Sequence, residues 1–160
     1  MIRSATERRL SELGLTLPDL APTHEFLAVK TTDNQCFVSG HAPYSDGRFQ
    51  FIGKVGADLD IDTGRQAAEL ATLGCLASLK AHLGDLDRIQ SVLKLNGYVN
   101  CDPQFADLPT VTDAASDLLA AIFGDGGRHA RTTVGVASLP QNVAVEVEMT
   151  VMIAPGDEAG

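Results

Sequence analysis

The alternation of apolar and polar residues is clearest near the end of the chain. Between Val143 and Ile153 apolar residues hold every second position, and Glu146 and Glu148 fall between them. A period of two is typical of a strand that buries one face. The β-branched run over residues 131–137 predicts a second strand, and Leu-Pro-Gln-Asn at 139–142 predicts a turn. We therefore expect these two strands to pair as a β-hairpin.

The side-chain alternation of such a hairpin would gather charged groups on one face. It predicts that Arg131, Thr133 and Gly135 share this face with Glu146 and Glu148. A guanidinium binds a planar carboxylate through two parallel hydrogen bonds, and a carboxylate can position or deprotonate a water. The pattern indicates a site for a small carboxylate-bearing ligand. A simple Arg–Glu pair on a solvated sheet face is the alternative interpretation.

Upstream of this hairpin, helical and strand periods alternate. Leucines recur at helical spacing between residues 63 and 83, beside a stripe of small residues that would let a helix lie close to a sheet. The order of elements predicts an α+β domain in which two long helices pack on one face of a mixed six-stranded sheet. The predicted elements are a helix over 3–14, strands over 26–30, 35–39, 49–55 and 89–101, and two long helices, one starting at Asp62 or Thr63 and ending at Gly84, the other capped by Thr110 and ending at Gly124.

The length of the chain and its apolar segments indicate how many domains it forms and whether it could span a membrane. One hundred and sixty residues fit a single core. We expect a lead-in over residues 1–22, one domain over 23–155 and a disordered tail over 156–160. No segment approaches the roughly 18 uncharged apolar residues of a membrane span, and the N-terminus lacks an apolar signal core. We therefore expect a cytoplasmic protein without membrane contact.

The net charge and the spacing of the cysteines and histidines limit which partners and metals the chain is expected to bind. The net charge is −9 and the 12 Lys and Arg residues are scattered, which disfavours nucleic acid as a partner. Cys36, Cys75 and Cys101 lie far apart, and the four histidines show no i,i+4 pairing. These spacings predict neither a disulfide framework nor a metal site.

Several short motifs, taken together, resemble the Rid (YjgF) family over about residues 20–154. They are Val38-Ser-Gly-His-Ala-Pro43, Gly53-Lys-Val-Gly-Ala-Asp58, Leu83-Gly-Asp-Leu-Asp-Arg88, and Arg131 followed by Leu139-Pro140 and Val145-Glu-Val-Glu148. The resemblance implies a chorismate-mutase-like fold and a homotrimer with clefts between its subunits. It also implies hydrolysis of imines and enamines such as 2-aminoacrylate, with no cofactor. The string Phe123-Gly-Asp-Gly-Gly-Arg-His-Ala-Arg131 resembles a divergent branch labelled endoribonuclease L-PSP.

The resemblance also implies roles for single residues. Arg131 matches the arginine that binds the substrate carboxylate, and Glu146 matches the glutamate that orients the hydrolytic water. Ser39 and Gly40 match a turn that lines the cleft, and Asp113 falls near the asparagine of the cleft. These residues, with Arg131 and Glu146 as the catalytic pair, form the predicted site.

Three further residues of the predicted cleft depart from the family pattern. Phe26 stands where the deaminating branch has a tyrosine, Thr133 where it has a cysteine, and His41 where it has a glutamine. Phe26 can donate neither a hydrogen bond nor a proton, so another group must serve any step that used the hydroxyl. His41 could take over proton transfer near neutral pH, although a loop histidine can also be merely exposed.

Three functions follow from this pattern and its departures. The first is a deaminase-type hydrolase of small imine or enamine carboxylates. The second is a non-catalytic trimeric protein that binds small carboxylates and has lost its chemistry with the tyrosine. The third is the endoribonuclease of the family label, which conflicts with the acidic composition.

Overall fold

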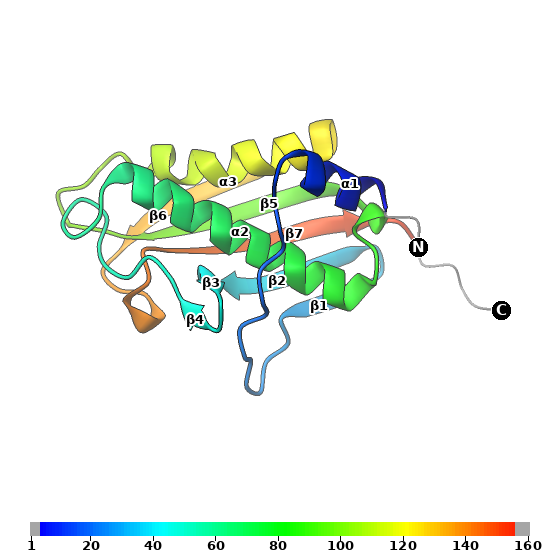
Figure 1. Ribbon diagram of the computed structural model, residues 1–160, viewed down its shortest axis with the longest axis horizontal. Coiled ribbons are helices and arrows are strands. Elements are labelled where there is room, and N and C mark those ends of the chain that lie inside the picture. Colours follow the sequence, from blue (N-terminus) through cyan, green and yellow to red (C-terminus); the bar gives the residue numbers. More distant parts are fainter. Residues whose placement is uncertain (1–3, 156–160) are drawn as a thin grey trace.

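The structure, a computed structural model, describes residues 4–155 of the chain. Two long helices cover one face of a five-stranded sheet (Figure 1), so the predicted α+β class is confirmed. The helices are α1 (Ala5–Glu12), α2 (Ile61–Leu83) and α3 (Leu108–Phe123). The strands are β1 (Val29–Thr32), β2 (Gln35–His41), β3 (Tyr44–Ser45), β4 (Arg48–Phe49), β5 (Ile89–Asn100), β6 (Ala130–Val136) and β7 (Val145–Ile153), and short 3₁₀ turns are η1 (Leu86–Arg88), η2 (Gly124–Gly127) and η3 (Pro140–Asn142). The disordered tail predicted over 156–160 lies outside the described residues.

The main sheet has the strand order β1-β2-β7-β5-β6, in which β5 pairs parallel with β6 and antiparallel with β7. It is mixed, as predicted, but it contains five strands and not six. Phe49 ends the short strand β4, and the rest of the strand expected over residues 49–55 makes only isolated bridges, among them Ile52 with Val143 and Val55 with Cys101. Phe51 has φ 54°, which turns the chain out of the extended conformation that a ladder needs.

The predicted hairpin between residues 131–137 and 143–153 is wrong, although both segments are strands. β5 lies between them and pairs with each, so β6 becomes an edge strand of the sheet. The connection passes over the end of β5, where the buried Asn100 side chain donates to Asn142 Oδ1 at 3.0 Å and to the Val143 carbonyl at 3.1 Å. Strand order therefore differs from chain order at this edge.

This strand order also decides which way the charged side chains point. Leu95 of β5 is fully buried under the helices and is in register with both Arg131 and Met149. Arg131 therefore points to the helical side of the sheet, while Glu146 and Glu148 alternate to the opposite side. The expectation that the arginine and the two glutamates share one face is wrong within a single chain.

The two long helices bury their small and apolar residues against the sheet. In α2 the small residues Ala67, Ala71, Gly74 and Ser78 are buried, which agrees with the predicted small-residue stripe, and Leu76 beside them is fully buried. The caps lie slightly upstream of the predicted positions. Asp60, and not Asp62 or Thr63, caps α2 by accepting a hydrogen bond from the Thr63 backbone at 2.8 Å. At α3 the N-cap residue is Asp107, and Thr110 donates to its side chain. Both helices end before the expected glycines, Gly84 and Gly124.

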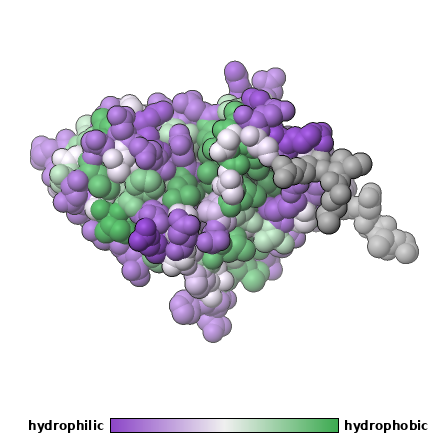
Figure 2. Space-filling model, viewed as in Figure 1, coloured by the Kyte–Doolittle hydropathy of each residue, from purple (hydrophilic) through white to green (hydrophobic). Residues whose placement is uncertain are grey.

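The N-terminal helix α1 is fastened to the far end of the domain. The Asp87 carboxylate of η1 accepts from the Ala5 and Thr6 backbones at 2.7 and 2.8 Å and from the Thr6 hydroxyl at 2.7 Å. The chain then runs across α2 towards β1 (Figure 1). Leu13, Leu15 and Leu17 of this crossing pack on the core, and Figure 2 shows hydrophobic residues gathered along its path. The lead-in is therefore held by hydrogen bonds at its start and by apolar packing along the crossing.

No helix among residues 4–155 combines the length and apolar character that a membrane span requires.

Gly97 at the centre of β5 allows α3 to lie close to the sheet, and this contact can be tested. A Cβ at this position would lie 2.5 Å from Thr112 Cγ2. We expect Gly97→Ala to lower the free energy of unfolding by about 1–3 kcal/mol through overpacking, measured by urea denaturation. Gln90→Ala, at an exposed position of the same strand, is the control and should leave stability unchanged. Equal stability of Gly97→Ala and the wild type would contradict this packing.

Candidate functional site

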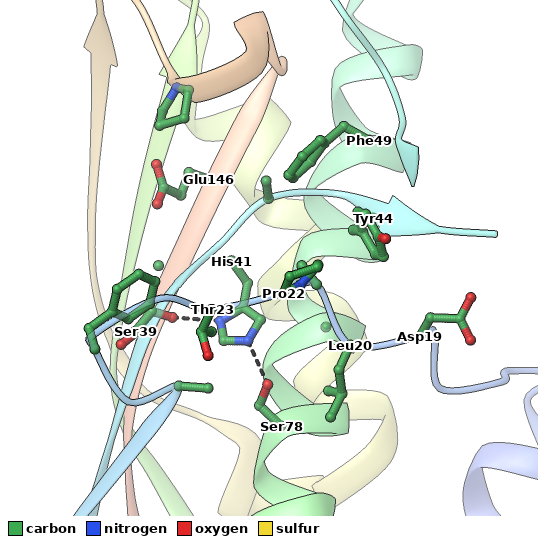
Figure 3. Close-up of a pocket in the computed structure, with 17 residues that line it drawn as sticks. Asp19, Leu20, Pro22, Thr23, Ser39, His41, Tyr44, Phe49, Ser78 and Glu146 are labelled. Atoms are coloured by element: carbon green, nitrogen blue, oxygen red, sulfur yellow. Dashed lines mark hydrogen bonds between the residues drawn. The ribbon is translucent and has the colours of Figure 1, made fainter. Parts of the chain in front are cut away.

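A pocket of about 370 Å³ lies between the end of β2, the middle of α2 and residues 19–28, which we call the covering segment (Figure 3). Five residues of the predicted site line it, and we call it the acid pocket after its glutamate. They are Phe26, Ser39, Gly40, His41 and Glu146. The other lining residues are Asp19, Leu20, Ala21, Pro22, Thr23, Ala28, Ala42, Tyr44, Phe49, Gly74, Ser78 and Pro140.

The acid pocket exists because β2 bends away from its neighbours. β1 pairs with β2 only as far as Val38, and the pairing of β2 with β7 shifts register between Val38 and His41. Gly40 sits at this irregularity, directly against the Glu146 side chain. A Cβ at position 40 would overlap Glu146 Oε1, so a larger residue there must displace the carboxylate. Glycine at this turn thus sets the position of the acid.

The carboxylate of Glu146 is held in an environment that disfavours its charge. The residue is half-buried, and this burial, with the negative charge of Glu148, raises the pKa of the Glu146 carboxyl above its ordinary value. None of the residues that line the pocket is Lys or Arg. Glu146 is therefore suited to taking up and releasing a proton, and an anionic ligand finds no cation within this chain's pocket.

His41 is fixed in one tautomer by two hydrogen bonds. Its Nδ1 lies 2.6 Å from the Ser39 carbonyl oxygen, which can only accept, so Nδ1 carries a proton. Nε2 lies 2.7 Å from the Ser78 hydroxyl of α2, and in the neutral ring it accepts the hydroxyl proton (dashed lines in Figure 3). Burial lowers the pKa of His41, and the hydrogen bond to the Ser39 carbonyl opposes this effect only in part. The histidine is a partnered wall residue and not an exposed loop residue.

The remaining predicted residues gather on the helical side of the sheet. Arg131 donates from Nη1 to Asp113 Oδ1 at 2.8 Å and to the Ser116 hydroxyl at 3.1 Å, and both acceptors belong to α3. We call these three residues the arginine cluster. Thr133, two positions further along β6, bonds to Thr112 at 2.7 Å. The predicted site is thus divided into two groups, one in the acid pocket beside β2 and one on β6, towards opposite edges of the sheet.

Glu148 has partners that Glu146 lacks. The Tyr98 hydroxyl donates to Glu148 Oε1 at 2.5 Å, and the Asn96 amide donates to the same oxygen at 3.0 Å. The hydrogen bond to Glu148, together with burial, raises the pKa of Tyr98 to about 12. Glu148 is therefore a fixed negative charge beside Glu146, and it is not part of the acid pocket's lining.

Sequence reasoning missed Ser78 as a member of the site. It appeared only as a small residue of the helix stripe, yet its hydroxyl holds the ring of His41. The available signal was its spacing of four from Gly74, since residues one turn apart share a helix face. Both residues line the pocket, so the small-residue face of α2 forms part of its wall.

The residues described carry no metal-binding cluster of three or more His, Cys, Asp or Glu. The fold and the pocket together define a small α+β domain that encloses a ligand-sized space beside a sheet edge. The sequence matches the family model "YjgF/chorismate_mutase-like, putative endoribonuclease" over residues 7–152, and the chain belongs to this family. The resemblance drawn from the short motifs is confirmed.

Three known proteins illustrate how similar this chain is to its relatives and over what length. Protein TCP17 of Trypanosoma cruzi is 41% identical over 144 residues, which make up 89% of this chain and 90% of that protein. The crystal structure of Atu1372, a protein of unknown function from Agrobacterium tumefaciens, has a TM-score of 0.88 and 42% identity, and the match covers 94% of this chain and 93% of the other. A 2-iminobutanoate/2-iminopropanoate deaminase of Dermatophagoides farinae is 35% identical over 66 residues, 41% of this chain and 45% of the deaminase.

The lowered pKa of His41 predicts a pH-dependent stability. In the unfolded chain the ring protonates near pH 6.5, whereas the folded state resists the proton. The free energy of unfolding should therefore fall as the pH drops below about 6.5. In His41→Gln this contribution should be absent, so the variant should lose less stability than the wild type between about pH 7 and pH 5.

The control for this measurement is His24→Gln, which removes an exposed histidine and should keep the wild-type pH dependence. Thermal unfolding followed by circular dichroism across this pH range provides the comparison. If His41→Gln and the wild type lose stability in parallel, the histidine is not held neutral in the folded state.

Proposed function

We propose that the chain hydrolyses small imine or enamine carboxylates to keto acids and ammonia. The reaction takes place in clefts between the subunits of a homotrimer. One subunit supplies the acid pocket with Glu146, and the next supplies Arg131 from its edge strand. The identified family and the partial match to an iminobutanoate deaminase support this assignment.

The observation that carries the proposal is the separation of the acid from the cation. A carboxylate substrate needs a cation, and the acid pocket has neither Lys nor Arg in its lining. Arg131 lies on β6 at one edge of the sheet, and the acid pocket lies beside β2, towards the other edge. A head-to-tail contact that joins unlike edges generates a closed ring when its rotation permits. Such a ring unites the two groups in every cleft.

The chemistry requires positioning and one proton-transfer group. Arg131 of the neighbouring subunit binds the substrate carboxylate through two hydrogen bonds, which fixes the imine carbon relative to Glu146. Glu146 takes a proton from water as the oxygen attacks the imine carbon. The same carboxyl returns this proton to the nitrogen, which gives the neutral carbinolamine. Glu146 then takes the hydroxyl proton as the carbonyl forms and delivers it to the nitrogen, and ammonia leaves as the C–N bond breaks. An enamine first gains a proton at carbon to become the imine.

The raised pKa of Glu146 suits this double role, since a carboxyl with a higher pKa is a stronger base and remains able to donate. Ser39 and Gly40 form the wall beside it. Phe26 contributes apolar surface and no proton, so the acid–base work falls to Glu146, with the neutral His41 held nearby. Asp113 orients Arg131 through their ion pair of 2.8 Å, and Thr133 follows on the same side of β6.

Ribonuclease activity, as in the family description, is not part of this proposal. The net charge is −9, and the lining of the acid pocket contains neither Lys nor Arg to bind a phosphate backbone.

An assay with 2-aminoacrylate or 2-iminobutanoate generated in situ tests the reaction. We expect the wild type to accelerate keto-acid release, and Glu146→Gln and Gly40→Ala to lower kcat by about 100-fold or more, as loss of a general acid–base group typically does. Glu146→Gln should also raise Tm at neutral pH. A raised pKa means that the ionised carboxylate destabilises the fold above about pH 4.5, and the amide removes this effect.

The increase in Tm separates lost chemistry from lost folding. If keto-acid release is the same with and without the wild-type protein, the hydrolase is refuted. Calorimetry with a keto acid then distinguishes the binding protein, for which Arg131→Ala abolishes binding and Glu146→Gln has little effect.

Mixed trimers test the shared site. Arg131→Ala and Glu146→Gln subunits, each inactive alone, are co-expressed with different affinity tags, and trimers containing both are purified. In such a ring about one cleft in three joins an intact Arg131 to an intact Glu146, so we expect roughly a third of the wild-type activity. Light scattering checks the trimer mass. Mixed trimers as inactive as their parents would show that both residues serve a site within one chain.

A further inference from the structure

We infer that the acid pocket selects 2-imino acids with a large apolar side chain, branched or aromatic, over those derived from alanine or serine. The inference rests on the proposed function and names the substrate class of the same site.

The pocket is larger than a small imino acid requires. Its volume of about 370 Å³ falls within the range of roughly 300–1,000 Å³ that holds drug-sized ligands. At roughly 30 Å³ for each water, the same space corresponds to about a dozen water molecules. 2-Iminopropanoate, whose side chain is one methyl group, would leave most of this space to water. A leucine- or phenylalanine-derived side chain would displace that water.

The walls of the pocket divide into an acid end and an apolar end. Figure 3 shows Glu146 and Ser39 on one side and Leu20, Tyr44 and Phe49 on the other. Tyr44 and Phe49 meet edge to face, with ring centroids 5.2 Å apart and planes at 71°. This arrangement is a preformed aromatic wall that favours contact with a further ring or a branched chain. A substrate whose reacting carbon lies at Glu146 therefore directs its side chain towards apolar surface.

Two of the polar groups between these ends, His41 and Ser78, bond to each other and to the chain itself. His41 Nδ1 donates to the Ser39 carbonyl, and Nε2 accepts from Ser78. A charged side chain placed against these two groups would lose its water without gaining a hydrogen bond from the histidine ring, which costs free energy. This part of the wall therefore disfavours polar side chains, whereas the hydroxyls of Thr23 and Tyr44 also line the pocket.

The covering segment exposes apolar surface at the rim of the same space. Leu20 is 50% exposed and Phe26 is 55% exposed, although both line the pocket. Burying such surface against a bulky ligand is favourable. The substrates that fit are produced by two-electron oxidation of the amino group of leucine, isoleucine or phenylalanine. The reaction that supplies this site is therefore an amino acid oxidation and not a β-elimination from serine.

Competition assays test the preference. An L-amino acid oxidase generates the imines of leucine, phenylalanine and alanine in situ, and semicarbazide traps what the protein does not hydrolyse. We expect kcat/KM for the leucine and phenylalanine imines to exceed that for the alanine imine by at least about tenfold, since a single methylene is already worth that much in an apolar pocket. Comparable or higher values for the alanine imine overturn the inference and leave the proposed hydrolysis intact.

A filling variant locates the preference in the pocket. Ala42 lines the pocket, and Ala42→Leu should lower kcat/KM for the phenylalanine imine by about tenfold while changing that for the alanine imine less than about twofold. Ala81→Leu makes the same substitution at an exposed position of α2 outside the pocket and should change neither value. An equal effect of Ala42→Leu on both imines would show that the side chain does not enter this space.

Product binding gives a readout that does not depend on turnover. Calorimetry with phenylpyruvate and with pyruvate should show at least about tenfold tighter binding of phenylpyruvate to the wild type, and Ala42→Leu should remove the difference. If no imine is hydrolysed but this difference is found, the proposed reaction fails and the assigned ligand class stands. If phenylpyruvate binds no more tightly than pyruvate, the inference is wrong whatever the activity.

Discussion

β7 lies between β2 and β5, and the alternation of its buried and exposed side chains is the constraint on which the rest of the structure depends. Val145, Val147, Met149 and Val151 are buried beneath the helices, and Glu146, Glu148 and Thr150 point to the other side of the sheet. A shift of one residue would exchange the two sets and expose the apolar side chains. This penalty fixes Glu146 and Glu148 on the side away from the helices. The position of the candidate acid follows from the packing of its neighbours.

The same constraint places a charge where it is poorly solvated. Glu148 is accommodated by the Tyr98 hydroxyl and the Asn96 amide, whereas Glu146 faces a pocket without a cation. Gly40 keeps a space open for the Glu146 carboxylate that any side chain would fill. Stability is therefore reduced at the point where a proton-transfer group is formed, as is common at functional sites.

The elements of the fold could be predicted from local periods, but their pairing could not. The period of two in residues 143–153 and the helical leucines of α2 report which face of each element is buried. They do not report which strand lies beside which, because pairing depends on the path of the connections. Residues 137–144 look like a hairpin turn, yet they cross the end of β5, and this one difference moves Arg131 to the helical side. The short motifs still contain residues of both groups, among them Glu146 and Arg131, because the resemblance does not depend on strand order.

The lead-in connects the N-terminal helix α1 to the segment that covers the acid pocket. Three hydrogen bonds from Ala5 and Thr6 to Asp87 tie α1 down at one end of α2, and the chain crosses the helix before it reaches the pocket (Figure 1). The covering segment, which lines the acid pocket together with Glu146, thus continues a crossing whose start is fixed at Asp87. Substitutions at Asp87 would therefore shift the covering segment and change the opening of the acid pocket, although Asp87 does not line the pocket.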